Sequence, residues 1–158
     1  MEEKAKKKYP PEEALLKMQS WCAYQERCQQ EARDKLYSYG LWPDAVENII
    51  ADLISQNFLN EERFAKAFAG GKFRIKKWGR VKIKLALKQK KISDYCIKKA
   101  LQEIDEDDYI KTLTSVLEKK GRLLAEKNPV KRKYKLLQYA YSRGFEQDLA
   151  LDVLKDED

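Results

Sequence analysis

Apolar residues recur along this chain with the 3.6-residue period of an α-helix. The clearest stripe has members at i, i+1, i+4, i+5, i+8 and i+9, positions that share one face of a helix: Ala45, Val46, Ile49, Ile50, Leu53 and Ile54. Two later segments repeat the helical pattern: Ile97, Ala100, Leu101 and Ile104, and then Leu149, Ala150, Val153 and Leu154. The pattern therefore predicts amphipathic helices with buried apolar faces.

The segments that precede these stripes are in phase with one another. A shorter apolar pair and a turn come before each stripe, and seven apolar positions keep their offsets in three copies. The turns lie at Gly40, at Lys91 51 positions later, and at Gly144 a further 53 positions on. An additional apolar segment leads each copy: Leu15, Met18 and Cys22; Phe64, Ala67 and Phe68; and Ile110, Leu113, Val116 and Leu117. An internal repeat of this kind indicates tandem structural modules.

The repeat predicts an all-α fold of three tandem three-helix repeats. We expect them over 14–59, 60–104 and 105–156, after a flexible charged arm over 1–13. Pro43 suits a first helical turn, whereas Ser93 and Asn128 suit N-caps. Because each small module buries its apolar stripes against its neighbours, we expect an elongated, curved molecule.

Two local features qualify this picture. Gly40 and Gly144 suit a left-handed residue just past a helix end, and each is followed by an apolar residue. Lys91 must adopt the same geometry at some energetic cost or turn differently. Between Val81 and Leu87, apolar and other residues alternate in a way that locally resembles a strand. The repeat offsets and the lack of a partner strand favour a helix there.

The charge is concentrated in the middle copy. The chain has 158 residues, with 33 Lys and Arg against 26 Asp and Glu, giving a net charge of +7. The arm and the three copies carry nets of 0, −2, +10 and −1. Ten basic residues fall in one acid-free stretch of twenty: Lys72, Arg74, Lys76, Lys77, Arg80, Lys82, Lys84, Lys88, Lys90 and Lys91. Such a stretch repels itself, so it favours an anionic partner.

Spacing within this basic run suggests a binding face. Arg80, Lys84, Lys88 and Lys91 fall at i, i+4, i+8 and i+11, which aligns them along one helical face. Trp78 and Phe73 could stack on a base or pack in the core. A single surface lysine more commonly covers apolar surface with its stem, but the absence of acids favours binding for the whole run. A membrane surface fits less well, because no large apolar face accompanies the charge.

A second, smaller basic group lies in the matching helix of the third copy. It could extend the basic surface or offset neighbouring acids, and it comprises Lys131, Arg132, Lys133 and Lys135. Arg63 could contact a partner or pair with a nearby acid, while Phe64 shares an apolar stripe and is expected to pack.

Catalytic and metal chemistry find little support in the sequence. There is no histidine, and Cys22, Cys28 and Cys96 suit neither a disulfide framework nor a four-thiolate zinc site. Gly70-Gly71-Lys72 lacks the spacing of a phosphate loop, and the acids over 103–108 lack that of a calcium loop. With no apolar run of 18 residues, we expect a cytoplasmic, non-enzymatic protein without a cofactor.

The segment from Phe58 to Phe68, with Arg63-Phe64-Ala65 at its centre, resembles the RecX family of bacterial recombination regulators. The following Trp78-Gly79-Arg80, then Ile83, Leu87 and Lys91-Ile92, is similar to that family's next motif, in which glycine usually occupies the position of Lys91. The resemblance extends from Leu15 to about Leu154 and includes three tandem three-helix repeats. The third copy is similar mainly in pattern.

The resemblance implies a modulator of the RecA recombinase in DNA repair and recombination. Members of the family bind the RecA–DNA filament along its helical groove, limit its growth, and inhibit strand exchange, ATP hydrolysis and coprotease activity. It implies no cofactor and no catalytic residue. The expected partners are the RecA filament and single- or double-stranded DNA, bound weakly and without sequence specificity, by a monomer with no membrane contact. Two alternatives stay open: a stand-alone helical nucleic-acid-binding protein, and an adaptor whose basic patch binds an acidic protein.

Overall fold

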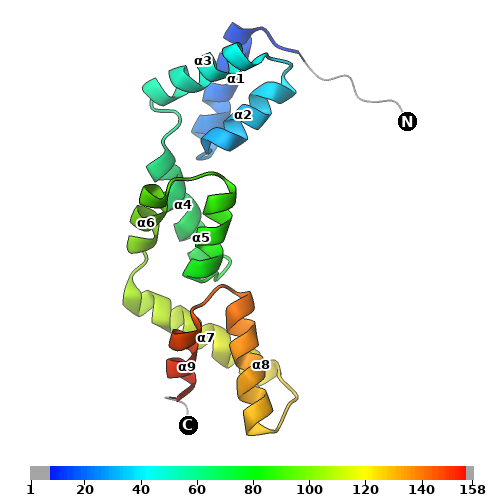
Figure 1. The fold of residues 1–158 in the computed structure, drawn as a ribbon, viewed down its shortest axis with the longest axis vertical. Helices are drawn as coiled ribbons and strands as arrows, with labels where there is room; N and C mark the ends of the chain where they lie inside the picture. The colour runs from blue at the N-terminus through cyan, green and yellow to red at the C-terminus, as the bar shows by residue number, and fades with distance from the viewer. Residues whose placement is uncertain (1–7, 156–158) are drawn as a thin grey trace, which may run out of the picture.

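The computed structural model describes residues 8–155, which form an elongated stack of three helical modules (Figure 1). Most of the predicted arm, residues 1–7, lies outside this range. The described part contains nine helices and no strand. They are α1 (Pro11–Tyr24), α2 (Gln29–Ser38) and α3 (Pro43–Ser55) in repeat 1; α4 (Glu61–Arg74), α5 (Arg80–Gln89) and α6 (Asp94–Gln102) in repeat 2; and α7 (Glu106–Leu123), α8 (Pro129–Ser142) and α9 (Gln147–Lys155) in repeat 3. The all-α prediction of three-helix repeats is confirmed.

Several helices begin at side-chain caps that the sequence provides. Asn60 Oδ1 accepts a hydrogen bond from Arg63 N at 2.8 Å, and Ser93 Oγ accepts one from Cys96 N at 3.2 Å. Asp105 and Asn128 cap α7 and α8 in the same way. Helix α1 begins at Pro11, at a position where a backbone N–H would have no partner within the helix, so its absence from proline costs nothing. Three residues that the sequence assigned to the arm are therefore helical.

The second helix of each repeat is followed, two positions after its last residue, by a residue with positive φ. The values are +83° at Gly40, +62° at Lys91 and +91° at Gly144. In repeat 2, Ile92 N donates to Leu87 O at 3.1 Å, and this bond closes the turn. Lys91 therefore does adopt the left-handed geometry that glycine occupies in the other two copies.

Helix α5 replaces the local strand pattern seen in the sequence. Ile83 and Leu87, four residues apart, are buried, whereas Val81 and Leu85 between them are 51% and 58% exposed. A strand would put all four on one face, but the helix buries only the pair that shares the repeat's apolar stripe. The prediction of a helix at this point is confirmed.

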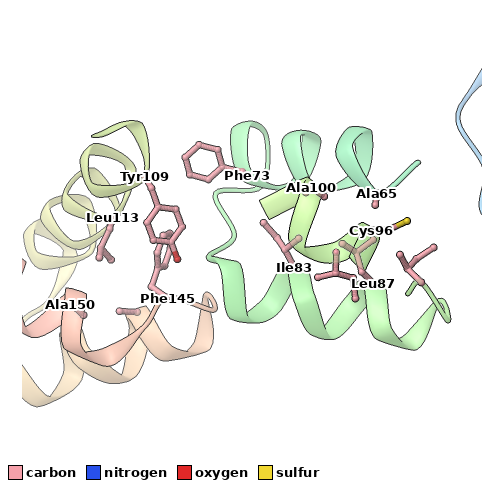
Figure 2. Packing of buried hydrophobic residues seen from close by; sticks show 14 of the residues in the cluster. Ala65, Phe73, Ile83, Leu87, Cys96, Ala100, Tyr109, Leu113, Phe145 and Ala150 are labelled. Carbon is pink, nitrogen blue, oxygen red and sulfur yellow. The ribbon is translucent and has the colours of Figure 1, made fainter. Parts of the chain in front are cut away.

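The buried side chains form two hydrophobic cores. One belongs to repeat 1, with Met18, Leu36 and Leu53 at its centre. The other runs without a break through repeats 2 and 3 (Figure 2). At the boundary Tyr109 stacks on Phe73 with ring centroids 5.8 Å apart and meets Phe145 at 5.3 Å. Repeats 2 and 3 therefore share a core to which repeat 1 contributes only Cys28 among the buried residues described.

Backbone contacts also join repeats 2 and 3. Gly79 N, just before α5, donates to Arg143 O at 2.8 Å, and Val81 N donates to Gly144 O at 3.0 Å. A Cβ on Gly79 would lie 2.3 Å from Gly144 O, so only glycine permits this approach. Within residues 8–155, no helix is both long enough and apolar enough to cross a lipid bilayer.

Candidate nucleic-acid and filament interface

The basic run does not form one continuous face in the structure. Six of its ten side chains are exposed and four are half-buried. The exposed ones are Arg74, Lys76, Lys77, Lys84, Lys88 and Lys91, and the half-buried ones are Lys72, Arg80, Lys82 and Lys90. Eight of the ten are distributed over three separate surfaces, and Lys76 and Lys91 lie on none of the three.

The first surface is a groove of about 450 Å³ between the end of α4 and α7, here called the α4–α7 groove. Arg74 and Lys77 line it from repeat 2, while Lys111 and Lys119 line it from repeat 3. The hydroxyl-bearing Thr112 and Ser115 and the single carboxylate of Asp108 are also present, next to Phe73 and Val116. Four cations with hydroxyl donors beside them form a set that suits phosphate oxygens.

The second surface is a larger groove of about 880 Å³ along α6, here called the α5–α6 groove. Lys84 and Lys88 line it from α5, and Lys98 lines it from α6. Ile97, Leu101 and Ile104 supply apolar surface, and its carboxylates are Asp94, Asp105 and Glu106. This groove is therefore chemically mixed, unlike the first.

Carboxylates separate the two basic grooves. A smaller hollow between them is lined by Glu103, Asp105 and Asp108, together with Lys66 and Arg74. It shares Asp105 with the α5–α6 groove and Asp108 with the α4–α7 groove. A single anionic chain that crossed from one groove to the other would pass these acids, so the grooves are electrostatically distinct.

The third surface surrounds Trp78. The Lys72 and Lys82 ammonium groups lie 4.9 and 4.6 Å from the Trp78 ring centroid, and Lys90 lies 5.7 Å from that of Phe68. These cation–π contacts hold three lysines of the run against aromatic rings of the protein itself. Trp78 is half-buried and packs against the core, so the packing alternative raised from sequence is the one found.

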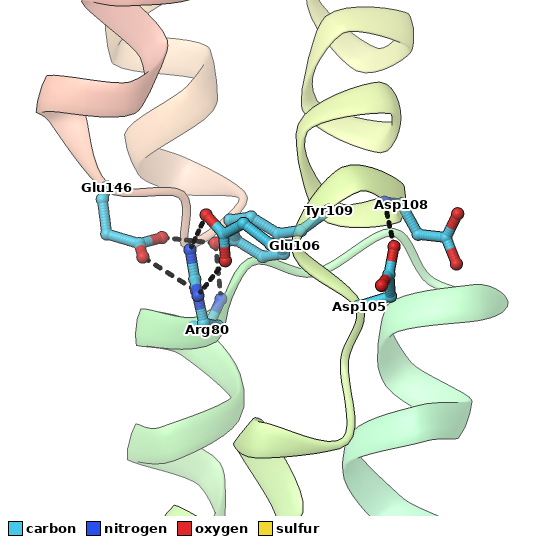
Figure 3. A network of polar contacts seen from close by, with 6 residues as sticks. All are labelled: Arg80, Asp105, Glu106, Asp108, Tyr109 and Glu146. Carbon is cyan, nitrogen blue, oxygen red and sulfur yellow. Dashed lines mark hydrogen bonds and ion pairs between the residues drawn. The ribbon is translucent and has the colours of Figure 1, made fainter.

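Arg80 differs from Lys84 and Lys88 because it forms ion pairs within the protein. Figure 3 shows its side chain between two carboxylates: Nη1 is 3.0 Å from Glu106 Oε2, and Nε is 2.9 Å from Glu146 Oε2. Its guanidinium also lies 3.9 Å from the Tyr109 ring centroid. Arg80 thus lines the same groove as Lys84 and Lys88, but its guanidinium is paired with carboxylates of repeat 3, because the start of α5 faces that repeat.

This cluster shifts two pKa values. Burial, with the hydrogen bond that Tyr109 Oη donates to Glu146, raises the pKa of the Tyr109 phenol. Burial alone would lower the pKa of Arg80, but the hydrogen bonds with Glu106 and Tyr109 and the charge of Glu146 outweigh it, and the pKa is raised. Tyr109 Oη also accepts from Arg80 N at 2.9 Å. The Tyr109 phenol and the Arg80 guanidinium thus both stay protonated near neutral pH.

Two other candidate arginines, Arg63 and Arg132, form hydrogen bonds within the protein. Arg63 Nε lies 2.5 Å from Glu26 Oε1, and its Nη2 donates to Asn57 O at 3.0 Å, so it joins repeat 1 to repeat 2. Arg132 donates to the carbonyls of Gly121, Leu124 and Glu126 at the end of α7. Of the remaining second group, Lys131 is exposed, Lys133 is half-buried and Lys135 lies 3.3 Å from Glu126.

Sequence reasoning missed the residues that complete the grooves. Lys111, Ser115 and Lys119 stand at i, i+4 and i+8 on α7, a spacing that could have been recognised. Lys98 was not predicted because it lies beyond Asp94, outside the acid-free stretch. Only the packing of α6 and α7 against α5 and α4 brings these residues to the run.

Stacked three-helix modules with a strongly basic middle module define an all-helical repeat protein. The chain belongs to the RecX family of regulatory proteins. The family model described as RecX, second three-helix domain, matches residues 60–101, and the one described as RecX, third three-helix domain, matches residues 106–154.

Relatives and solved structures agree with this assignment. The regulatory protein RecX of Lactobacillus johnsonii is 30% identical over 147 residues, which cover 93% of this chain and 54% of the relative. That of Clostridium perfringens is 32% identical over 131 residues, covering 82% and 61%. The chain thus spans little more than half the length of these curated relatives. The crystal structure of RecX from Lactobacillus salivarius shares the fold, with a TM-score of 0.83 at 22% identity over 92% of this chain and 95% of that one.

Proposed function

We propose that this protein is a non-enzymatic cytoplasmic regulator that binds the RecA recombinase–DNA filament, limits its growth, and inhibits ATP hydrolysis and strand exchange. The family assignment supports a regulatory role. The observation that carries DNA contact is the α4–α7 groove, where two repeats together supply four cations. An elongated molecule with such a groove suits the helical groove of a filament made of protein and DNA (Figure 1).

Phosphate contact would account for the position of this groove, which lies across the joint between repeats 2 and 3. Arg74 and Lys77 belong to repeat 2, and Lys111 and Lys119 belong to repeat 3. Their spacing therefore depends on the backbone bonds that fix repeat 3 against the start of α5. A rigid joint holds the cations in place before binding, which reduces the entropy lost when an anion is bound. Binding of this kind recognises the sugar–phosphate backbone of the nucleic acid and not its base sequence.

The test is the double variant Lys111→Gln with Lys119→Gln. Both side chains are exposed on α7, so folding should be unaffected. We expect weaker single-stranded DNA binding, a log K against log salt slope smaller in magnitude by roughly 1.4, since each lost contact removes about 0.7, and loss of inhibition of RecA ATP hydrolysis. The matched control is Lys127→Gln with Lys155→Gln, which removes two exposed charges outside the run.

Two results would contradict the proposal. If both double variants weaken inhibition equally, only net charge matters and the α4–α7 groove is not the contact. If excess free DNA relieves inhibition by the wild-type protein, then it competes for the strand as a plain nucleic-acid-binding protein. A filament regulator should keep inhibiting under those conditions, provided that the recombinase stays assembled.

A further inference from the structure

We propose that the α5–α6 groove binds a short acidic segment of a protein partner, anchored by apolar side chains. The groove is thus a protein-docking site, distinct from the phosphate contact in the α4–α7 groove. The proposal rests on the proposed function only for the identity of that partner, the recombinase.

The cations of this groove are available to a ligand. Lys84, Lys88 and Lys98 are exposed, and none of the three forms an ion pair with another residue in the described part of the chain. Arg80 at the end of the groove is already held by Glu106 and Glu146. Three lysines on two facing walls therefore attract carboxylates from both sides of a bound segment.

The apolar part of the groove supplies anchoring surface. Ile97 is almost fully buried, whereas Leu101 and Ile104 are half-buried and keep part of their surface at the groove. A phosphate backbone gains nothing from such surface, but an apolar side chain on a peptide gains by covering it. Helix α6 has nine residues, so the groove beside it is about 13 Å long. That length matches about two helical turns or about four extended residues of a ligand.

Nucleic acid is the less suitable occupant. Asp94 lies at the first turn of α6 and Asp105 lies just beyond its last, so a continuous phosphate chain would meet a carboxylate at each end. The residues that line the groove within the described structure include no aromatic ring on which a base could stack. An acidic peptide with apolar anchors avoids both problems, because it needs no base stacking and can place its carboxylates at the lysines and its uncharged amides at the two aspartates.

The experiment compares three variants at one fixed salt concentration, because screening would otherwise imitate the substitutions. Lys84→Gln with Lys98→Gln removes charge from both walls, and Leu101→Gln alters the apolar surface while keeping a good helix former. Lys111→Gln with Lys119→Gln is the matched control in the other groove. Binding to DNA-free RecA and binding to single-stranded DNA alone are measured for each, and thermal melting confirms that each is folded.

We expect Lys84→Gln with Lys98→Gln to weaken RecA binding at least tenfold while changing DNA affinity less than threefold. Leu101→Gln should also weaken RecA binding, and the control should show the reverse preference. If instead the groove double variant loses DNA affinity and Leu101→Gln changes nothing, the groove holds nucleic acid and the proposal is wrong. Unchanged RecA binding in all three variants, with inhibition intact in the wild type, would remove the docking site but leave the proposed function standing.

A second probe keeps the groove testable without RecA. It is a fluorescent twelve-residue peptide with four Glu and three Leu at helical spacing. Saturable binding to the wild-type protein that both groove variants lose would support the docking site, even if RecA did not bind at all. A lack of RecA binding would by itself refute the proposed function. Equal peptide binding by the wild type and the groove variants would overturn the docking site.

Discussion

Lys91 has a backbone conformation that its side chain disfavours. Its φ of +62° lies in the left-handed region, where a Cβ crowds the following carbonyl at a cost of about 1–2 kcal/mol. The side chain is exposed, and Ile92 immediately after it is buried in the shared core. The burial of Ile92 and the bond from Ile92 N to Leu87 O thus hold Lys91 in place.

We therefore expect Lys91→Gly to stabilise the protein. Relief of the left-handed strain is partly offset by the greater freedom of glycine in the unfolded chain, so the net gain should be about 0.5–1 kcal/mol. The melting temperature should then rise by about 1–4 °C. Lys88→Gly, within α5, is the control and should lower stability by a similar amount, because glycine there only weakens a helix. A lower melting temperature for Lys91→Gly would contradict this account.

Single residues also show where sequence reasoning about the site stops. Exposure of Lys84 and Lys88 followed from their spacing against Ile83 and Leu87, and the structure agrees. The inward turn of Arg80 did not follow, because its acceptors Glu106 and Glu146 are 26 and 66 positions away. Spacing along one helix predicts which residues lie on the same face. It contains no information about which residues of another repeat lie opposite that face.

At the scale of elements, α5 depends on a repeat to which it does not belong. It lacks a side-chain N-cap, and Gly79, Arg80 and Val81 donate to Arg143, Tyr109 and Gly144 of repeat 3. The donors that most helices satisfy locally are here satisfied between modules. The apolar offsets were sufficient to predict α5 as a helix. They could not predict this joint, since its partners are mostly backbone atoms.

Gly79→Ala should loosen the joint. The new Cβ would lie 2.3 Å from Gly144 O, a backbone atom that cannot move aside without displacing the turn. We expect the free energy of unfolding to fall by about 2–3 kcal/mol, typical of overpacking at a close contact, and DNA affinity to fall with it, because the α4–α7 groove spans the joint.

The control for this substitution is Gly71→Ala, in the last turn of α4, where nothing lies within 4 Å of the new methyl group. It should raise stability by about 0.5–1 kcal/mol through better helix propensity. Equal effects of the two substitutions in denaturant unfolding would show that the contact between Gly79 and Gly144 does not constrain the joint.

At the scale of the whole molecule, the described residues divide into two parts by their hydrophobic cores. Repeat 1 has its own core, and polar contacts such as Arg63 with Glu26 connect it to repeat 2. Cys28, at the start of α2, reaches into the shared core of repeats 2 and 3, and its burial raises the pKa of this thiol to about 11. Tandem modules of this kind are stabilised by their own cores and by nearest-neighbour interfaces.

Leu53→Ala should therefore destabilise repeat 1 selectively. Leu53 is fully buried in the first core, and its truncation should cost about 3 kcal/mol. Amide exchange in residues 14–59 should accelerate by about two orders of magnitude, while residues 106–155 change little. An equal acceleration in the third repeat would mean that the three repeats unfold as one unit.

The joint at Gly79 also imposes an order on events while the chain is being synthesised. The Gly79 amide is translated 64 positions before its acceptor, the Arg143 carbonyl, a delay of about 3–13 s at ordinary rates of elongation. Every residue of the first core has been translated before this interval begins. Throughout the interval α5 starts without its acceptors and the shared core is half assembled, so a ribosome that pauses between codons 80 and 143 would prolong exposure of Ile83 and Leu87 to chaperones and to other nascent chains.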